Sequence, residues 1–241
     1  MSGHSKWAQI KHQKAGTDAK RGTLFSKLAR MITVAARDAR GNPDMNPKLR
    51  QAVEQAREAG LPKDNIERAI ERATGSGADA TALRAFAYEA YGPGGSAFLI
   101  TGLTDSQNRT TNEIKRILDE HGGRLAESGS VAWMFERKVA FTLPLPQAEQ
   151  RDECELYLID GGADAIETDA EALCVLVQPE RAARFPEHLA ARGIIPLRSA
   201  LTAIPKTSIA LGPEDAATVE ELAAALLDQD DVTDVWTNVG A

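Results

Sequence analysis

The spacing of apolar residues along this chain changes at Gly75-Ser76-Gly77. Before this tripeptide, apolar side chains recur with the period of an amphipathic helix. After it, they alternate with the period of two that half-buried strands show. The two parts cannot share one type of secondary structure, because a helix and a strand place differently spaced residues on one face. The small residues between the two patterns are typical of a linker. The sequence therefore predicts a helical N-terminal part followed by a part built on β-strands.

The N-terminal part is expected to contain three helices. In residues 23–40 the apolar side chains fall on one side of a helical wheel. A second helix starts at Asn46-Pro47, a cap followed by a proline in the first turn, and ends at Gly60. A third helix occupies residues 62–75. Three short helices of this kind predict one small bundle.

A complete ferredoxin-like unit is predicted in the second half of the chain. The order of its elements is strand, helix, strand, strand, helix, strand, which is the split βαβ arrangement. The expected elements are, in that order, residues 139–143, 147–159, 165–168, 173–178, 180–192 and 194–201.

The elements on either side of this unit are expected to form one further domain. Strands at 86–91 and 97–103, a helix at 111–120 and a strand at 131–135 precede the unit. A strand at 207–211, a helix at 214–227 and a strand at 232–238 follow it. The last three elements are too few to close a domain alone, so we expect them to fold back. The predicted class is α+β, with a basic helical domain at 1–78, a discontinuous α+β domain at 79–135 plus 206–241, and the inserted ferredoxin-like domain at 136–205.

Charge is distributed unevenly along the chain. The net charge is -7, yet residues 1–75 contain 15 Lys and Arg against 8 Asp and Glu, or +7, and the remainder contains 13 against 27, or -14. Such a dipole orients a molecule near a polyanion. The first third is therefore expected to bind nucleic acid.

The N-terminal segment is the strongest candidate for that contact. Flexible cations bind phosphates, and the indole of Trp7 offers a face on which a base can stack. The polar side of the first helix extends the positive surface onto a rigid element. The alternative is a solvated basic tail. The predicted nucleic-acid-binding residues are Lys6, Trp7, Lys11, Lys14, Lys20, Arg21, Lys27, Arg30 and Arg37.

A second polar site is predicted at Asp105, Asn108 and Arg109, between a strand end and a helix start. Helix N-termini present free N–H groups to anions, and Arg109 would add a second donor. The alternative is that Asp105 or Ser106 caps the helix.

Several other classes of function are not expected. The carboxylates of Asp228, Asp230 and Asp231 lack the spacing of a calcium loop, so no metal is predicted. Familiar catalytic motifs are missing, so no enzyme, cofactor or small-molecule substrate is expected. Cys154 and Cys174 form no ligand pair, and no run of eighteen apolar residues exists. A reducing cytoplasmic location without membrane contact follows as an expectation.

Motifs along nearly the whole length make the chain resemble the YebC family. They are Gly3-His4-Ser5-Lys6-Trp7, Ile10-Lys11, Asp18-Ala19-Lys20-Arg21-Gly22, Lys63-Asp64-Asn65-Ile66, Arg68-Ala69-Ile70, Tyr91-Gly92-Pro93-Gly94-Gly95, Thr104-Asp105, Asn108-Arg109-Thr110, Gly122-Gly123, Gly129-Ser130-Val131, Pro205-Lys206-Thr207 and Asp230-Asp231-Val232. The resemblance implies a helical domain followed by two α+β domains. It also implies a role in gene expression, since some members are described as DNA-binding transcriptional regulators. Others, including mitochondrial translational activators, are linked to the ribosome and to relief of stalling on proline-rich nascent sequences.

Two partners remain open, and RNA is favoured. A ribosome-associated translation factor would contact ribosomal RNA or transfer RNA through the basic segment, whose glycines and stacking tryptophan suit irregular RNA. The alternative is a regulator that binds duplex DNA, although the candidate helices show no clear helix-turn-helix spacing. An unrecognised enzyme is a distant third hypothesis.

Overall fold

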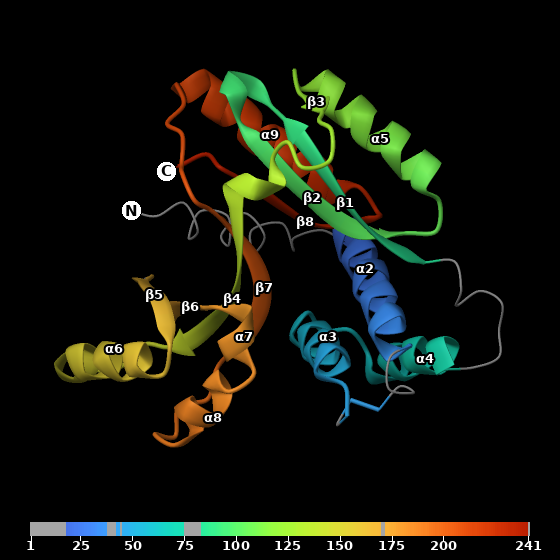
Figure 1. Ribbon diagram of the computed structural model, residues 1–241. Coiled ribbons are helices and arrows are strands. Elements are labelled where there is room, and N and C mark those ends of the chain that lie inside the picture. The colour runs from blue at the N-terminus through green and yellow to red at the C-terminus, as the bar shows by residue number, and fades with distance from the viewer. Residues whose placement is uncertain (1–17, 38–41, 44, 75–82, 170–171, 241) are drawn as a thin grey trace. The chain divides into compact units, whose positions relative to one another are not determined.

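The structure is a computed structural model that describes residues 18–37, 42–43, 45–74, 83–169 and 172–240 (Figure 1). It contains two compact units. Residues 135–206 form one, and the described parts of 6–134 and 207–241 form the other. Helices come first along the chain, followed by two four-stranded antiparallel sheets. The predicted α+β class is therefore confirmed, while the division into three domains remains a prediction.

The three predicted N-terminal helices are present as α2 (Asp18–Ala36), α3 (Pro47–Glu58) and α4 (Lys63–Thr74). Their apolar sides share one core that includes the fully buried Ile32 and Leu49. The amide of Asn46 caps α3 by accepting from the N–H of Leu49 at 3.1 Å, and its Nδ2 donates to the carbonyl of Ala35 at 2.7 Å. One side chain thus starts α3 and attaches it to α2.

The first sheet has the order β3-β1-β2-β8. Its strands are β1 (Arg84–Tyr91), β2 (Ala97–Thr104), β3 (Arg124–Leu125) and β8 (Val232–Thr237), and the 3₁₀ turn η3 (Pro93–Gly95) joins β1 to β2. Helices α5 (Gln107–Glu120) and α9 (Pro213–Asp228) share one apolar core with this sheet, with Leu118 and Leu222 fully buried. Because β8 pairs with β2, the C-terminal part of the chain lies beside residues much earlier in the sequence.

Two predicted strands around this sheet are wrong. Residues 131–135 form a turn and the 3₁₀ helix η4 (Ala132–Met134), and the strand begins only at Phe135. The backbone N–H groups of Val131 and Ala132 donate to the carboxylate of Glu89, so they are not available to a strand ladder. Residues 207–211 contribute only an isolated bridge, between Ile209 and Val239.

The second unit is the predicted ferredoxin-like arrangement, with the strand order β5-β6-β4-β7. Its elements are β4 (Phe135–Pro144), η5 (Ala148–Gln150), α6 (Arg151–Asp160), β5 (Ala163–Thr168), β6 (Ala172–Val177), α7 (Pro179–Ala182), α8 (Phe185–Ala190) and β7 (Arg198–Pro205). The helix predicted at 180–192 is divided in two, because Pro186 lacks the N–H that a continuous helix would need there. Cys154 and Cys174 are free thiols.

None of the described helices is both long enough and apolar enough to cross a bilayer.

Candidate nucleic-acid interface and the Asp231 network

The described structure covers only part of the predicted N-terminal interface. Lys6, Trp7, Lys11 and Lys14 lie outside the described residues. Lys20 and Arg21 belong to the first turns of α2, where the backbone alone is described.

The positive excess of the first third lies entirely in residues 1–40. That segment has nine Lys and Arg against two Asp and Glu, whereas residues 41–75 have six of each. Helices α3 and α4 therefore present mixed charge. Within the first third, the charge balance therefore favours residues 1–40 as the part that attracts phosphates.

Two of the predicted cations, one on α2 and one directly after it, donate to backbone carbonyls elsewhere in the same unit. The amine of Lys27 donates to the carbonyl oxygen of Leu227 at 2.6 Å, and Nη1 of Arg37 donates to that of Leu83 at 3.0 Å. The polar side of α2 therefore contacts the end of α9, and the residue after α2 contacts the residue that precedes β1. The role of these cations in binding nucleic acid stays a prediction.

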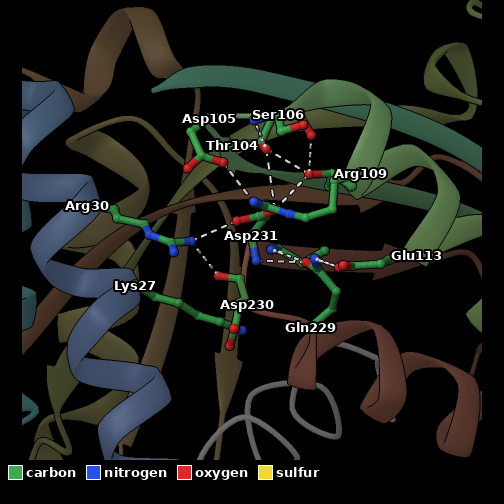
Figure 2. A network of polar contacts seen from close by, with 12 residues as sticks. Lys27, Arg30, Thr104, Asp105, Ser106, Arg109, Glu113, Gln229, Asp230 and Asp231 are labelled. Atoms are coloured by element: carbon green, nitrogen blue, oxygen red, sulfur yellow. Dashed lines mark hydrogen bonds and ion pairs between the residues drawn. The ribbon is translucent and has the colours of Figure 1, made fainter. Parts of the chain in front are cut away.

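Arg30, the third predicted cation, forms an ion pair with Asp231 (Figure 2). Its Nη1 lies 2.7 Å from Oδ1 of Asp231 and 3.3 Å from the carbonyl oxygen of Asp230. A phosphate that bound Arg30 in this conformation would compete with Asp231.

Asp231 is the centre of a buried network, with only 1% of its side chain exposed. Its Oδ2 accepts from Nη2 of Arg109 at 2.8 Å and from the hydroxyl of Thr110 at 2.7 Å. Burial alone would raise the pKa of Asp231. These hydrogen bonds and the charges of Arg109 and Arg30 outweigh burial, so the net shift is downward. Arg30, Thr104, Arg109, Thr110 and Asp231 are called the Asp231 network below.

A chain of hydrogen bonds connects the start of α5 to this carboxylate. The N–H of Ser106 donates to Oγ1 of Thr104 at 2.9 Å, and the Thr104 and Thr110 hydroxyls lie 2.7 Å apart. The hydroxyl of Thr104 also lies 3.3 Å from Oδ2 of Asp231, and that of Thr110 lies 3.0 Å from the carbonyl oxygen of Ser106. Both hydroxyls thus lie within hydrogen-bond distance of the same carboxylate oxygen.

Gln229 braces the turn that carries Asp231. Its Oε1 accepts from the N–H groups of Asp231 and Val232 at 2.7 and 2.9 Å, and its Nε2 donates to Glu113 at 2.7 Å (Figure 2). The turn between α9 and β8 is therefore tied to α5 by side chains as well as by packing.

The predicted polar site at the start of α5 is only partly assembled. Asp105 and Arg109 form an ion pair at 2.8 Å, while Asn108 is exposed. Ser106 is the N-cap residue of α5, but its side chain makes no capping hydrogen bond. A depression of about 310 Å³ lies beside them, lined by Arg84, Thr104, Asp105 and Gln107. Anion binding here stays a prediction.

Sequence reasoning missed the role of Asp231, which it treated as part of a solvated acidic loop. The sequence signal that could have indicated this role is the position of Asp231 directly before an apolar strand. The register that pairs Gly102 with Val232 brings this acid next to Thr104. Among the described residues no cluster of three or more metal-ligand side chains occurs.

Glu89 is a second buried acid that sequence reasoning missed. Its carboxylate accepts from the backbone N–H groups of Gly129 at 2.6 Å, Val131 at 2.5 Å and Ala132 at 2.7 Å. Burial would raise the pKa of Glu89, but these three donors lower it below its ordinary value. The carboxylate thus holds the turn before η4 in one conformation.

Lys27 is expected to make stability depend on alkaline pH. Burial lowers its pKa from 10.5 to about 8, although nearby Asp230 and Asp228 act in the opposite direction. Between these two values the unfolded chain holds a proton that the folded protein has released, so stability rises with pH. In urea unfolding, the free energy of unfolding of the wild type should rise relative to that of Lys27→Met as the pH rises from about 8 to about 10.5. The control is Lys63→Met, at an exposed lysine, and it should show no such trend. If the difference in free energy of unfolding between the wild type and Lys27→Met does not change with pH, burial does not lower the pKa of Lys27.

Comparisons with known proteins cover almost the whole chain. Residues 5–76 match the family model for the TACO1/YebC protein N-terminal domain, and residues 83–239 match that for the TACO1/YebC second and third domain. A probable transcriptional regulatory protein of Fervidobacterium nodosum is 48% identical over 99% of this chain and 93% of its own length. A protein of the same description from Petrotoga mobilis is 45% identical over 90% of this chain and 85% of its own. The crystal structure of a conserved hypothetical protein from Aquifex aeolicus has a TM-score of 0.85 and 38% identity, covering 97% of this chain and 96% of that one.

Proposed function

The chain belongs to the TACO1/YebC family, and from this premise we propose that it regulates gene expression by binding nucleic acid without catalysing a reaction. The partner we favour is the ribosome. In this proposal the basic segment contacts ribosomal or transfer RNA in the cytoplasm and helps synthesis continue through proline-rich sequences.

The observation that best supports this proposal is where the positive charge lies. All the excess of the first third belongs to residues 1–40, and Arg30 joins α2 by an ion pair to Asp231, in the turn before β8. A short basic segment ahead of an anchored helix can follow the irregular path of folded RNA while the acidic remainder is repelled. Binding is therefore one-sided and driven by phosphates.

Duplex DNA is the second candidate, because the similar proteins are described as probable transcriptional regulatory proteins. Reading base edges requires a helix whose exposed side chains are not repelled by the DNA backbone. The exposed side of α4 carries Glu67 and Glu71 as well as cations, and Glu67 lies 3.4 Å from the amine of Lys63. This mixture weakens the case for α4 as a recognition helix.

Co-sedimentation with ribosomes over a salt series tests the proposal. If about six phosphates are contacted, binding should weaken roughly a thousandfold between 50 and 200 mM salt. The double variant Lys6→Ala with Trp7→Ala should bind about tenfold more weakly, since it loses one cation and one stacking ring, with an unchanged melting temperature.

Lys63→Ala is the matched control, because it removes an exposed cation from α4, and it should bind as the wild type does. A gel shift on duplex DNA is run in parallel. Tight, sequence-selective binding to the duplex together with no ribosome binding would replace the translation proposal with the DNA alternative.

A further inference from the structure

The turn before η4 carries an exposed tryptophan in a fixed orientation. The Trp133 side chain is large and apolar, yet the residue is 64% exposed. Its indole Nε1 donates to the carbonyl oxygen of Ser130 at 3.0 Å. A surface tryptophan normally turns among rotamers, and this hydrogen bond selects one of them. The ring therefore presents itself to solvent in a defined position.

The same carbonyl oxygen binds a second aromatic residue. The hydroxyl of Tyr91 donates to Ser130 at 3.2 Å, so two aromatic side chains converge on one acceptor. Arg124, opposite Tyr91 on β3, places its guanidinium carbon 5.6 Å from the centre of the tyrosine ring. Arg124 is exposed, and among the described residues no ion pair joins it to a carboxylate. The surface thus combines two rings with an uncompensated cation.

The buried carboxylate of Glu89 orders the turn that carries Trp133. Glu89 and Tyr91 are two residues apart on β1, so both project from the side of the sheet opposite the core shared with α5 and α9. The carboxylate of Glu89 accepts from three N–H groups of the turn, and the hydroxyl of Tyr91 donates to the carbonyl oxygen of Ser130 in the same turn. A loop ordered by a buried carboxylate keeps its conformation before any ligand arrives, which lowers the entropy lost on binding.

We propose that Trp133, Tyr91 and Arg124 form a stacking subsite for an unpaired base of RNA. The inference rests on the proposed function and adds a second contact point far along the sequence from the basic segment. The base lies against the exposed indole face, and the guanidinium of Arg124 attracts the adjacent phosphate. Stacking of this kind tolerates any base, because every base has a π-face.

A protein partner fits this surface less well. Anchoring tryptophans at protein interfaces are surrounded by other contacts that exclude water. Val131, just before η4, is apolar but fully buried. The other residues that precede Trp133 in the turn are small or polar, namely Glu127, Ser128, Gly129, Ser130 and Ala132, and all but Ser130 are exposed. One exposed indole without exposed apolar neighbours in its turn, linked through Ser130 to the tyrosine against which Arg124 lies, matches one planar base and its phosphate.

Fluorescence anisotropy with the full chain tests the subsite. The probe is a labelled polyuridine strand of about twelve nucleotides, and an RNA hairpin without unpaired bases in its stem serves as the paired control. Trp133→Ala should weaken binding to the strand about tenfold, Trp133→Leu equally, and Trp133→Phe much less, because phenylalanine keeps a ring. Binding to the stem should not change in any of these variants. Because residue 133 is exposed, the melting temperature should also be unchanged, which is measured alongside.

The outcomes separate this inference from the proposed function. Strand binding that Lys6→Ala with Trp7→Ala weakens but Trp133→Ala leaves intact would overturn the subsite alone. Full retention of affinity for the strand in Trp133→Leu would show that no aromatic ring is needed at residue 133 and would overturn the stacking subsite. If the wild type binds neither strand nor ribosome, both proposals are wrong.

Discussion

Replacing Asp231 by alanine should lower the free energy of unfolding by about 3 kcal/mol, the lower end of what breaking a buried ion pair costs. The substitution leaves the charges of Arg30 and Arg109 without their shared partner, and it removes the acceptor of the buried Thr110 hydroxyl. The cost stays at the lower end because the two arginine side chains are 33% and 45% exposed and can turn to water. Urea unfolding followed by circular dichroism measures the loss.

Asp230→Asn is the matched control, since the neighbouring side chain is exposed and only its backbone carbonyl contacts Arg30. It should change stability by less than about 0.5 kcal/mol. The folded pKa of Asp231 is lowered, so its contribution is present above the ordinary value of 3.8 and is lost as the pH falls through the folded value. The difference between wild type and Asp231→Ala should therefore shrink in acid. A difference that does not depend on pH would mean that Asp231 is not held as a charge.

Replacing Glu89 by alanine should cost about 3 kcal/mol, because three backbone N–H groups lose a charged acceptor at once and part of the turn is buried. Glu89→Gln should cost somewhat less, since an amide keeps one acceptor oxygen but brings an N–H₂ group toward donors. The exposed Glu127→Ala, in the same segment, is the control and should be nearly neutral. Unfolding in urea again gives the values.

The Glu89 variants also test how the turn positions Trp133. If the carboxylate orders the turn, Glu89→Gln should increase amide hydrogen exchange at Gly129, Val131 and Ala132 while the core of the sheet stays protected. Unchanged exchange at these three amides would show that the turn is held by other contacts, and Glu89 would then have no part in positioning Trp133.

Local patterns in the sequence determined which elements form. The cap and proline at Asn46-Pro47 start α3, and the order of strands and helices from residue 135 onward specifies a ferredoxin-like unit, because both depend on neighbours along the chain. The strand expected at 131–135 was wrong because its N–H groups bind Glu89, some 42 residues earlier. No local pattern contains that acceptor.

The candidate site shows the same division. Composition alone located the positive charge in the first third, and the helical wheel placed Lys27, Arg30 and Arg37 on the polar side of α2. Whether that side meets water or another part of the protein is a question of tertiary structure, and the partner of Arg30 is 201 residues away. Periodicity tells which residues share a face, because the helix repeat is local. Only the folded chain decides what the face touches, because chain folding brings together residues whose separation in sequence carries no signal.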